Sequence, residues 1–498
     1  MRSALEHARS RRTRLALLAM VLVLPLTETG PPTATADATQ GVPVEGSVQQ
    51  VYHAGAPGGI PSTEIPDCDE NDEPPGCFKG EKLVLQGVGI GQKAAEPTIG
   101  VASDGTAYMA GSTIVVDTNF VWGVAKTDAR KSTDGGLTWT SIQPGLPVDG
   151  GGLPPGNADP MIYLDPGTNR IFTFDLTGAC QWLAYSDDEG ANWIQNPLAC
   201  GDVPVDHQTI VAAKPRGGLL TVLYPNALYY CTNRLVVSSC GRSINGGLTW
   251  QPLPNPAYGP IGSGCVGLHG HLEADPEGRI FLPTSQNCPS SRPYVSISET
   301  NGDSWVRREV STVSSATPHT SIASDSAGNL YYVWINSASG TTLPYLSTST
   351  DHGQTWSAPT MIAPPGVVQS NFPVVAGGDP GKIAISFPSA TTTASNRAWS
   401  QTVVVTEDAL AADPVFLSAT GNPPTNPIHR GVCGPGRCAG LWDFIDIQIS
   451  TAGEAWVATS DDCIGACNSG TTSATHVGDG IAVRQIGGPV LRTPPSGG

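Results

Sequence analysis

The feature that most constrains the fold is a segment that recurs seven times between residues 96 and 460. Each copy is a short apolar stretch, a turn that contains Gly, and a second apolar or aromatic stretch; in the third copy this second stretch is Leu219–Tyr224. The turn glycines follow one another at intervals of 50 to 72 residues, and a period near 50 matches one four-stranded blade of a β-propeller. The turn glycines are Gly105, Gly167, Gly217, Gly278, Gly328, Gly381 and Gly453.

The residues between the turns predict strands and not helices. β-branched and aromatic residues dominate there, while 59 Gly and 44 Pro interrupt any helix-length periodicity. We therefore predict an all-β chain, with a seven-bladed β-propeller over residues 81–488 and a flexible tail over 489–498. Strand-forming residues at 82–90 and 480–486 flank the copies, and their pairing would close the ring and remove exposed sheet edges.

A second motif, Ser-x-Asp-x-Gly-x-Thr-Trp, occurs in the later part of the first five copies. Its Asp carboxylate can accept backbone N–H bonds, its Gly permits positive φ, and its Trp can cover the turn. Asn245 and Thr300 replace the Asp in two of these turn motifs, and Thr406–Asp408 is a degenerate remnant in the sixth copy. We expect all of them to be structural. The turn motifs are residues 132–139, 186–193, 243–250, 298–305 and 349–356.

The turn motifs resemble the Asp box of sialidases, sortilins and related BNR-repeat propellers, which implies a place on the outer rim, away from catalysis. Sialidases also carry Arg-Ile-Pro before the first Asp box and two further arginines that hold the substrate carboxylate. Here Arg130 is the only arginine between residue 37 and the end of the first motif, and Arg279 to Pro283 lies in the fourth copy and interrupts the tripeptide. The bidentate clamp cannot be assembled. The resemblance therefore implies a sialidase-like fold without the arginine triad, and we expect no sialidase activity.

Residues 1–36 have the three parts of a secretory signal, namely a basic start, the apolar run 15–25 and the small-residue exit 34–36. About 11 apolar residues are too few for a membrane anchor, which needs roughly 20. We expect cleavage after Ala36 and a secreted, extracellular, monomeric protein with no membrane insertion. Residues 37–80, rich in Pro, Gly and acids, are expected to form an extended lead.

The net charge and the cysteine content further restrict the possible binding partners and metal sites. The net charge is −17, and about −20 without residues 1–36, which disfavours nucleic acid and anionic lipid as partners. Twelve cysteines in an exported chain predict disulfides; zinc is the alternative, but no C-x2-C pair occurs. The expected pairs are Cys68–Cys77, Cys180–Cys200, Cys231–Cys240, Cys265–Cys288, Cys433–Cys438 and Cys463–Cys467.

Polar residues begin the copies, and in a propeller the innermost strands line a central channel. Imidazoles and carboxylates are the groups whose pKa values can be tuned near neutrality, and four of the nine histidines lie in these starts. The alternative is that polar residues simply begin strands at a wet channel mouth. Strand alternation places His271 and Asp446 on the same side. The starting residues are Glu96, Asp159, His207 with Asp206 beside it, His269, His319, Asn371 and Asp443.

From this ring we predict a catalytic site of Glu96, Asp159, His207, His269, His319 and Asp443. No organic cofactor is expected, because nucleotide loops and the G-x-S-x-G elbow are absent from the sequence. The same groups could hold zinc or calcium, so a divalent metal stays open.

Three functions remain. The first is a hydrolase or lyase acting on an extracellular polysaccharide or glycoprotein, by analogy with similar folds; carboxylates about 5–10 Å apart would favour a hydrolase. The second is a non-catalytic propeller that binds a glycan or a protein, and the third is a ring that is structural or stabilised by metal. Aromatics outside the turn motifs could stack on sugars or merely pack the blades. They are Trp122, Trp182, Tyr229, Tyr230 and Trp399.

Overall fold

The structure is a computed structural model of the 498-residue chain, which divides into two units, residues 1–36 and 37–498. Strands and turns make up the described residues, apart from the short 3-10 helix Pro289–Ser291. None of the helices in this part of the chain is long and apolar enough to cross a membrane. The described residues are 39–40, 44–46, 48–56, 60–68, 75–112, 127–142, 158–177, 180–198, 206–234, 237–259, 264–434, 437–438, 444–463, 467–471 and 478–494.

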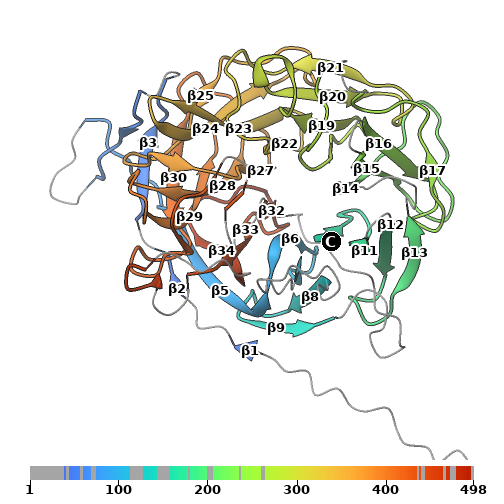
Figure 1. The fold of residues 1–498 in the computed structure, drawn as a ribbon, viewed down its shortest axis with the longest axis horizontal. Coiled ribbons are helices and arrows are strands. Elements are labelled where there is room, and N and C mark those ends of the chain that lie inside the picture. The colour runs from blue at the N-terminus through green and yellow to red at the C-terminus, as the bar shows by residue number, and fades with distance from the viewer. Residues whose placement is uncertain are drawn as a thin grey trace, which may run out of the picture. The chain divides into compact units, whose positions relative to one another are not determined.

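Consecutive strands form four-stranded antiparallel sheets, each running from an inner first strand to an outer fourth strand (Figure 1). The first four sheets are β6 (Ala95–Val101), β7 (Ala107–Ser112), β8 (Thr127–Ser132) and β9 (Thr138–Ser141); β10 (Ala158–Leu164), β11 (Ile171–Thr177), β12 (Cys180–Ser186) and β13 (Ile194–Leu198); β14 (Asp206–Ala213), β15 (Ala227–Arg234), β16 (Val237–Ser243) and β17 (Gln251–Pro252); and β18 (Glu273–Ala274), β19 (Ile280–Thr284), β20 (Tyr294–Ser298) and β21 (Val306–Glu309).

The next two groups are linked by β26 (Gln369–Ser370), which pairs with a strand of each. The small β31 (His429–Arg430) pairs with the start of β29. The two groups are β22 (Thr320–Ser324), β23 (Leu330–Ala338), β24 (Thr341–Ser349) and β25 (Thr360–Met361), and β27 (Val374–Gly377), β28 (Ile383–Ala390), β29 (Ala398–Thr406) and β30 (Val415–Thr420).

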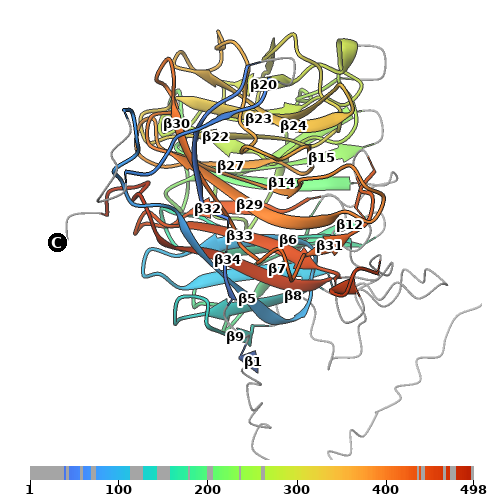
Figure 2. The same cartoon turned by 90° about the vertical axis from the view of Figure 1, so that its left-hand side faces the viewer.

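The last sheet joins distant parts of the chain. β32 (Asp446–Ile449), β33 (Ala455–Asp461) and β34 (Asp479–Gly487) are completed by β5 (Val84–Lys93), which pairs with β34. The two strands lie side by side in Figures 1 and 2. The predicted pairing of the two flanking segments is therefore confirmed.

Residues 37–80, expected to form an extended lead, contribute short outer strands. β1 (Thr39–Gln40) pairs with β9 and β2 (Val44–Glu45) with β5. β3 (Gln50–His53) pairs with β30 and β4 (Thr63–Glu64) with β3.

The first strands of neighbouring sheets contact one another in the order β6, β10, β14, β18, β22, β27 and β32, and β32 contacts β6. They therefore form a closed circuit, and the sheets pack face to face around it. Both faces of a sheet are covered, so strands such as β7 and β28 are buried along their whole length. Trp139 and Trp456, from adjacent sheets, lie in one of the core clusters between them.

The turn motifs have the hydrogen bonds that the sequence predicts. In the first motif the Asp134 carboxylate accepts the Thr138 backbone N–H at 2.9 Å. The indole N–H of Trp139 donates to the carbonyl of Gly136, also at 2.9 Å. The substituted motifs keep the first contact: Asn245 accepts the N–H of Thr249 and Thr300 that of Ser304. Short polar acceptors of either kind therefore hold these turns closed.

The third copy departs from the prediction. Its second strand is Ala227–Arg234, not Leu219–Tyr224. Leu220 and Thr221 have no regular secondary structure, and Val222 and Leu223 lie in a bend. Leu220 and Leu223 are 78% and 91% exposed. The tyrosine-rich run after Pro225 supplies the buried strand because it fills the core between sheets, and apolar composition alone does not distinguish two neighbouring apolar runs.

Five of the six expected disulfides are confirmed, each between nearest neighbours in the sequence. The sixth expected pair includes Cys200, which lies outside the described residues.

Candidate functional site

Three predicted site residues share an unusual backbone conformation. Glu96, Asp159 and His207 have φ values of 51°, 50° and 48°, and each lies where the pairing of its strand with the next shifts register. A residue other than Gly in this region costs about 1–2 kcal/mol. Its recurrence at one position of several sheets means that surrounding contacts must hold it in place.

Hydrogen bonds between neighbouring sheets supply these contacts. The Glu96 carboxylate accepts the backbone N–H of Asp159, and the Asp159 carboxylate accepts that of His207, both at 3.1 Å. The imidazole Nδ1–H of His207 donates to the carbonyl of His269 at 3.2 Å. These side chains therefore join the start of each first strand to the next sheet, which is a structural role in addition to any chemical one.

The same kind of contact continues further along the first strands. The Thr98 hydroxyl accepts the N–H of Ile162 at 2.6 Å, and the Asp446 carboxylate accepts the N–H of Ile99 at 3.0 Å. The inner edges of the first strands thus have their backbone donors satisfied by side chains of an adjacent sheet.

The predicted ring is shifted by one residue in the sixth copy. Phe372 has the left-handed conformation there, with φ 46°. The Asn371 amide oxygen accepts the N–H of Phe372 at 3.1 Å, as the Asp206 carboxylate accepts that of His207. Asn371 therefore corresponds to Asp206. A proline directly follows the left-handed residue in the first, second and sixth copies, and aligning on it would have placed Phe372 correctly.

Imidazole and phenyl rings pack together near the beginning of the first strands, where the sequence predicts the mouth of a channel. The ring of His319 lies 6.3 Å from that of His207 and 5.1 Å from that of Phe372, and the ring of Phe444 lies 5.8 Å from that of His207. The cavity that these rings and His269 line measures about 40 Å³, which is room for a water molecule and not for a sugar. A larger ligand would therefore lie over the rings. Neither phenylalanine was among the predicted site residues, because those were all polar.

Two histidines, the buried His269 and the half-buried His271, have strongly lowered pKa values. Burial lowers the pKa of His269 to about 3 and that of His271 to about 4. Both imidazoles are neutral at physiological pH and are weak proton acceptors, so a proton-transfer role falls to other groups.

Asp159 is the predicted site residue that titrates near neutrality. Burial, followed by the negative charge of Asp206, raises its pKa to about 7, and its carboxyl hydrogen bonds with Glu96 and Asp206. Asp159 is 8% exposed, whereas Asp206 and His207 are half-buried. A carboxyl group that stays partly protonated at pH 7 can donate a proton to a bound substrate.

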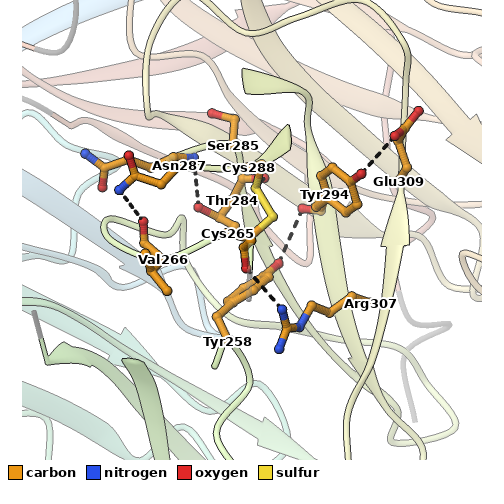
Figure 3. Close-up of a disulfide and its surroundings, with 12 residues drawn as sticks. Tyr258, Cys265, Val266, Thr284, Ser285, Asn287, Cys288, Tyr294, Arg307 and Glu309 are labelled. Carbon is orange, nitrogen blue, oxygen red and sulfur yellow. Dashed lines mark hydrogen bonds between the residues drawn. A yellow bond between two sulfur atoms is a disulfide. The ribbon is translucent and has the colours of Figure 1, made fainter. Parts of the chain in front are cut away.

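The segment leading to His269 is fixed by a disulfide, Cys265–Cys288, shown in Figure 3. The side-chain amide of Asn287 donates to the carbonyl of Val266 at 2.8 Å. On the other side, the guanidinium of Arg307 donates to the carbonyl of Gly264 at 3.0 Å. The approach to the mouth in this sheet is therefore rigid.

A chamber of about 250 Å³ lies along the first strands, with His271, Glu273 and Asp446 in its wall. Burial raises the pKa of Glu273 to about 8 and that of Asp446 to about 7. His271 Nδ1 lies 4.0 Å from the Asp446 carboxylate, in line with their predicted place on the same side. Glu273 was not among the predicted residues, although it follows His271 at the two-residue spacing of a strand.

The other predicted residues either lie outside the described part of the chain or are buried among the sheets. Asp443 and Trp122 lie outside the described residues, as does the side chain of Trp182. Tyr229, Tyr230 and Trp399 are buried at 0%, 2% and 1% exposure. These three aromatics pack the sheets and offer no surface to a sugar.

No metal-ligand cluster is found at the mouth within the described residues. Elsewhere in the described part of the chain, His429, Cys433 and Cys438 form a group of three potential ligands whose atoms lie within 4.8 Å of one another. Both cysteines of this group are in a disulfide.

No protein-family profile and no curated protein matches the sequence. Among solved structures, the chain is similar to a protein of unknown function from Dyadobacter fermentans, with 14% identity and a TM-score of 0.45 over 82% of this chain and 99% of that one. It is also similar to a Hadza microbial sialidase, with 12% identity and a TM-score of 0.44 over 77% and 91%. A third similar structure is an ulvan lyase, with 9% identity and a TM-score of 0.40 over 78% and 96%. These likenesses concern the all-β, propeller-like arrangement and assign no activity to this chain.

Proposed function

We propose that this protein is an exported, seven-bladed β-propeller that cleaves extracellular glycans by acid–base chemistry at one mouth of its central channel. The closed circuit of first strands, each leading a four-stranded sheet, supports the blade number. Export is supported by the signal-like residues 1–36 and by the disulfides of the described part of the chain.

One observation carries the catalytic part: a carboxyl with a pKa of about 7, Asp159, is hydrogen bonded to a second carboxyl and lies next to the half-buried His207. In the proposed mechanism Asp159 protonates the oxygen of the leaving sugar, and Asp206 shares its proton. The imidazole of His207 acts as the base, either on water or on a sugar proton. Glu96, His269 and His319 act as positioning groups, and we extend this role to Asp443, which lies outside the described residues.

The carboxyl geometry constrains the reaction type. Glu96, Asp159 and Asp206 are directly hydrogen bonded, which is closer than the spacing of about 5 Å or more between the paired carboxyls of glycoside hydrolases. The carboxyls therefore share a proton and act together as the acid, and His207 acts as the base. This acid and base pair serves a hydrolase or a lyase, and the sialidase-like resemblance without an arginine triad agrees with either.

The test is turnover on a panel of neutral and acidic polysaccharides, comparing the wild-type protein with Asp159→Asn and His207→Gln. The amide oxygen at 159 still accepts the N–H of residue 207, so this variant keeps the link between sheets. His53→Gln, on β3, is the matched control. Loss of product in both mouth variants, with the control unchanged, supports the proposal; unsaturated product indicates a lyase and saturated ends a hydrolase. Undiminished turnover in Asp159→Asn would refute it.

A second candidate is a non-catalytic propeller that recognises a glycan or glycoprotein. The observation that favours it is the use of the Glu96 and Asp159 carboxylates as acceptors for backbone N–H groups, together with the small volume under the rings. Binding to a glycan array without turnover of any bound glycan would select this function.

A further inference from the structure

A buried histidine and aspartate lie outside the mouth, between the last two sheets. His429, on β31, donates its Nδ1–H to the Asp462 carboxylate, at 2.8 and 3.0 Å to the two oxygens. The side chains are 2% and 0% exposed. The pairing fixes the tautomer of the neutral imidazole: Nδ1 carries the proton that is donated to the carboxylate, and Nε2 therefore has no proton and presents a lone pair.

That lone pair lacks a donor. Nε2 of His429 is buried and has no hydrogen-bond partner within the described part of the chain. The Sγ atoms of Cys433 and Cys438 and a ring nitrogen of His429 lie within 4.8 Å of one another. A disulfide has no proton to offer, so in the oxidised state the buried nitrogen stays unsatisfied, at a typical cost of about 1–3 kcal/mol.

We propose that His429, Cys433 and Cys438 form a site for a thiophilic d10 cation, Zn²⁺, when the cysteine pair is reduced. The cysteines are separated by four residues, within the spacing of zinc sites. Asp462 would orient the imidazole, as carboxylates commonly do for zinc-ligating histidines. Cys433 is half-buried, which gives the cation a route in and a water molecule the fourth position.

The chemistry balances with an external dithiol as reductant. The dithiol supplies two electrons and two protons, becomes a disulfide itself, and converts Cys433–Cys438 to two thiols. Zinc then displaces both thiol protons to solvent, while Nε2 coordinates through its existing lone pair. The disulfide and the zinc site are thus alternative states of the same residues, and neither depends on the glycan-cleaving function proposed for the mouth.

The chain contains a matched control. Cys463 and Cys467 are even closer in sequence and also form a disulfide, but no imidazole groups with them among the described residues. If proximity of two thiols sufficed for tight binding, both pairs would bind zinc alike.

The experiment is a titration of the full chain with Zn²⁺ against a chromophoric chelator, before and after anaerobic reduction with a dithiol that is then removed. We expect one tight equivalent in the reduced wild-type protein and none in the oxidised protein. Cys433→Ser/Cys438→Ser should lose it, Cys463→Ser/Cys467→Ser should keep it, and Asp462→Asn should weaken it about 10–100-fold.

Replacing zinc by Cd²⁺ gives a thiolate charge-transfer band as a second readout, which should disappear in the Cys433→Ser/Cys438→Ser variant. The proposal is overturned if the reduced wild-type protein has no tight site, if His429→Gln binds as tightly as the wild type, or if the Cys463→Ser/Cys467→Ser control loses the same equivalent. Circular dichroism of each reduced variant checks that it is folded, and the serine variant leaves the His429–Asp462 pair intact should His429→Gln unfold.

Discussion

Replacing Asp159 by Asn should change how the stability of the protein depends on pH. In the folded protein burial, followed by the negative charge of Asp206, raises the pKa of Asp159 to about 7, against the ordinary value of 3.8 that the unfolded chain approaches. The folded state therefore holds a proton that the unfolded state has released between about pH 4 and pH 7. Over that range the free energy of unfolding falls as the pH rises, and the contribution is fully lost above pH 7.

The magnitude follows from the difference between the two pKa values. At 1.36 kcal/mol for each pKa unit, a rise from 3.8 to about 7 corresponds to about 4 kcal/mol. Because Asp206 beside it is half-buried, solvent reduces the effect, and we expect about 2–4 kcal/mol. In Asp159→Asn the amide cannot ionise, while its NH2 group replaces the carboxyl proton toward the neighbouring carboxylates. The contribution of residue 159 to the pH dependence of the free energy of unfolding should therefore be absent in this variant.

The assay is denaturant unfolding of the wild-type protein and the variant at pH 5 and at pH 8. The variant should be the more stable of the two at both pH values, and its advantage should grow by about 1–3 kcal/mol between pH 5 and pH 8, because the unfolded Asp159 is already ionised at pH 5 whereas the folded one ionises near pH 7. Other buried carboxyls with raised pKa values contribute equally to both proteins and cancel in the comparison. Asp413→Asn, at a side chain that is 75% exposed, should leave the pH dependence unchanged. If the free energy of unfolding changed equally with pH in Asp159→Asn and in the wild type, the raised pKa of Asp159 would be refuted, and with it the proposed proton donor.

Two further predictions concern the turn motifs. Trp139→Phe should destabilise more than Trp356→Phe, by about 1–3 kcal/mol in denaturant unfolding, because Trp139 donates to the Gly136 carbonyl whereas the Trp356 indole N–H is unpaired within the described residues; equal losses would contradict this. Gly136→Ala and Gly105→Ala both place a side chain at positive φ, 88° and 89°. Only the first meets Trp456, at 3.1 Å, so its melting temperature should fall further, and the reverse order would show that strain alone decides.

The sequence predicts the parts of this fold that depend on local chemistry. The turn motifs are an example, because Asp134 needs only residues up to Trp139 to make its bonds. The pairing of β5 with β34 was also predictable, since two unpaired strand-like segments remained at either end of the repeats. Both predictions rest on requirements that can be read from the sequence, because the turn needs its hydrogen bonds and the sheet edge needs a partner strand.

Predictions that depend on register were less successful. Leu219–Tyr224 was expected to be a strand because it is apolar, but packing between sheets selects the next run. Asn371 was expected at the mouth because it is polar, yet its backbone position places Phe372 there. The pairing of His429 with Asp462 could not be predicted, since it joins loops of two sheets that no local pattern relates.

The pairing of β5 with β34 also determines when the last sheet can be completed during synthesis of the chain. A ribosome makes Val84–Lys93 early and Asp479–Gly487 late, so the first of these strands must wait, unpaired along one edge, until nearly the whole chain has been synthesised. During that interval it is an open template for the strands of other molecules. A helper that shields this one edge would protect the chain until β34 pairs with it.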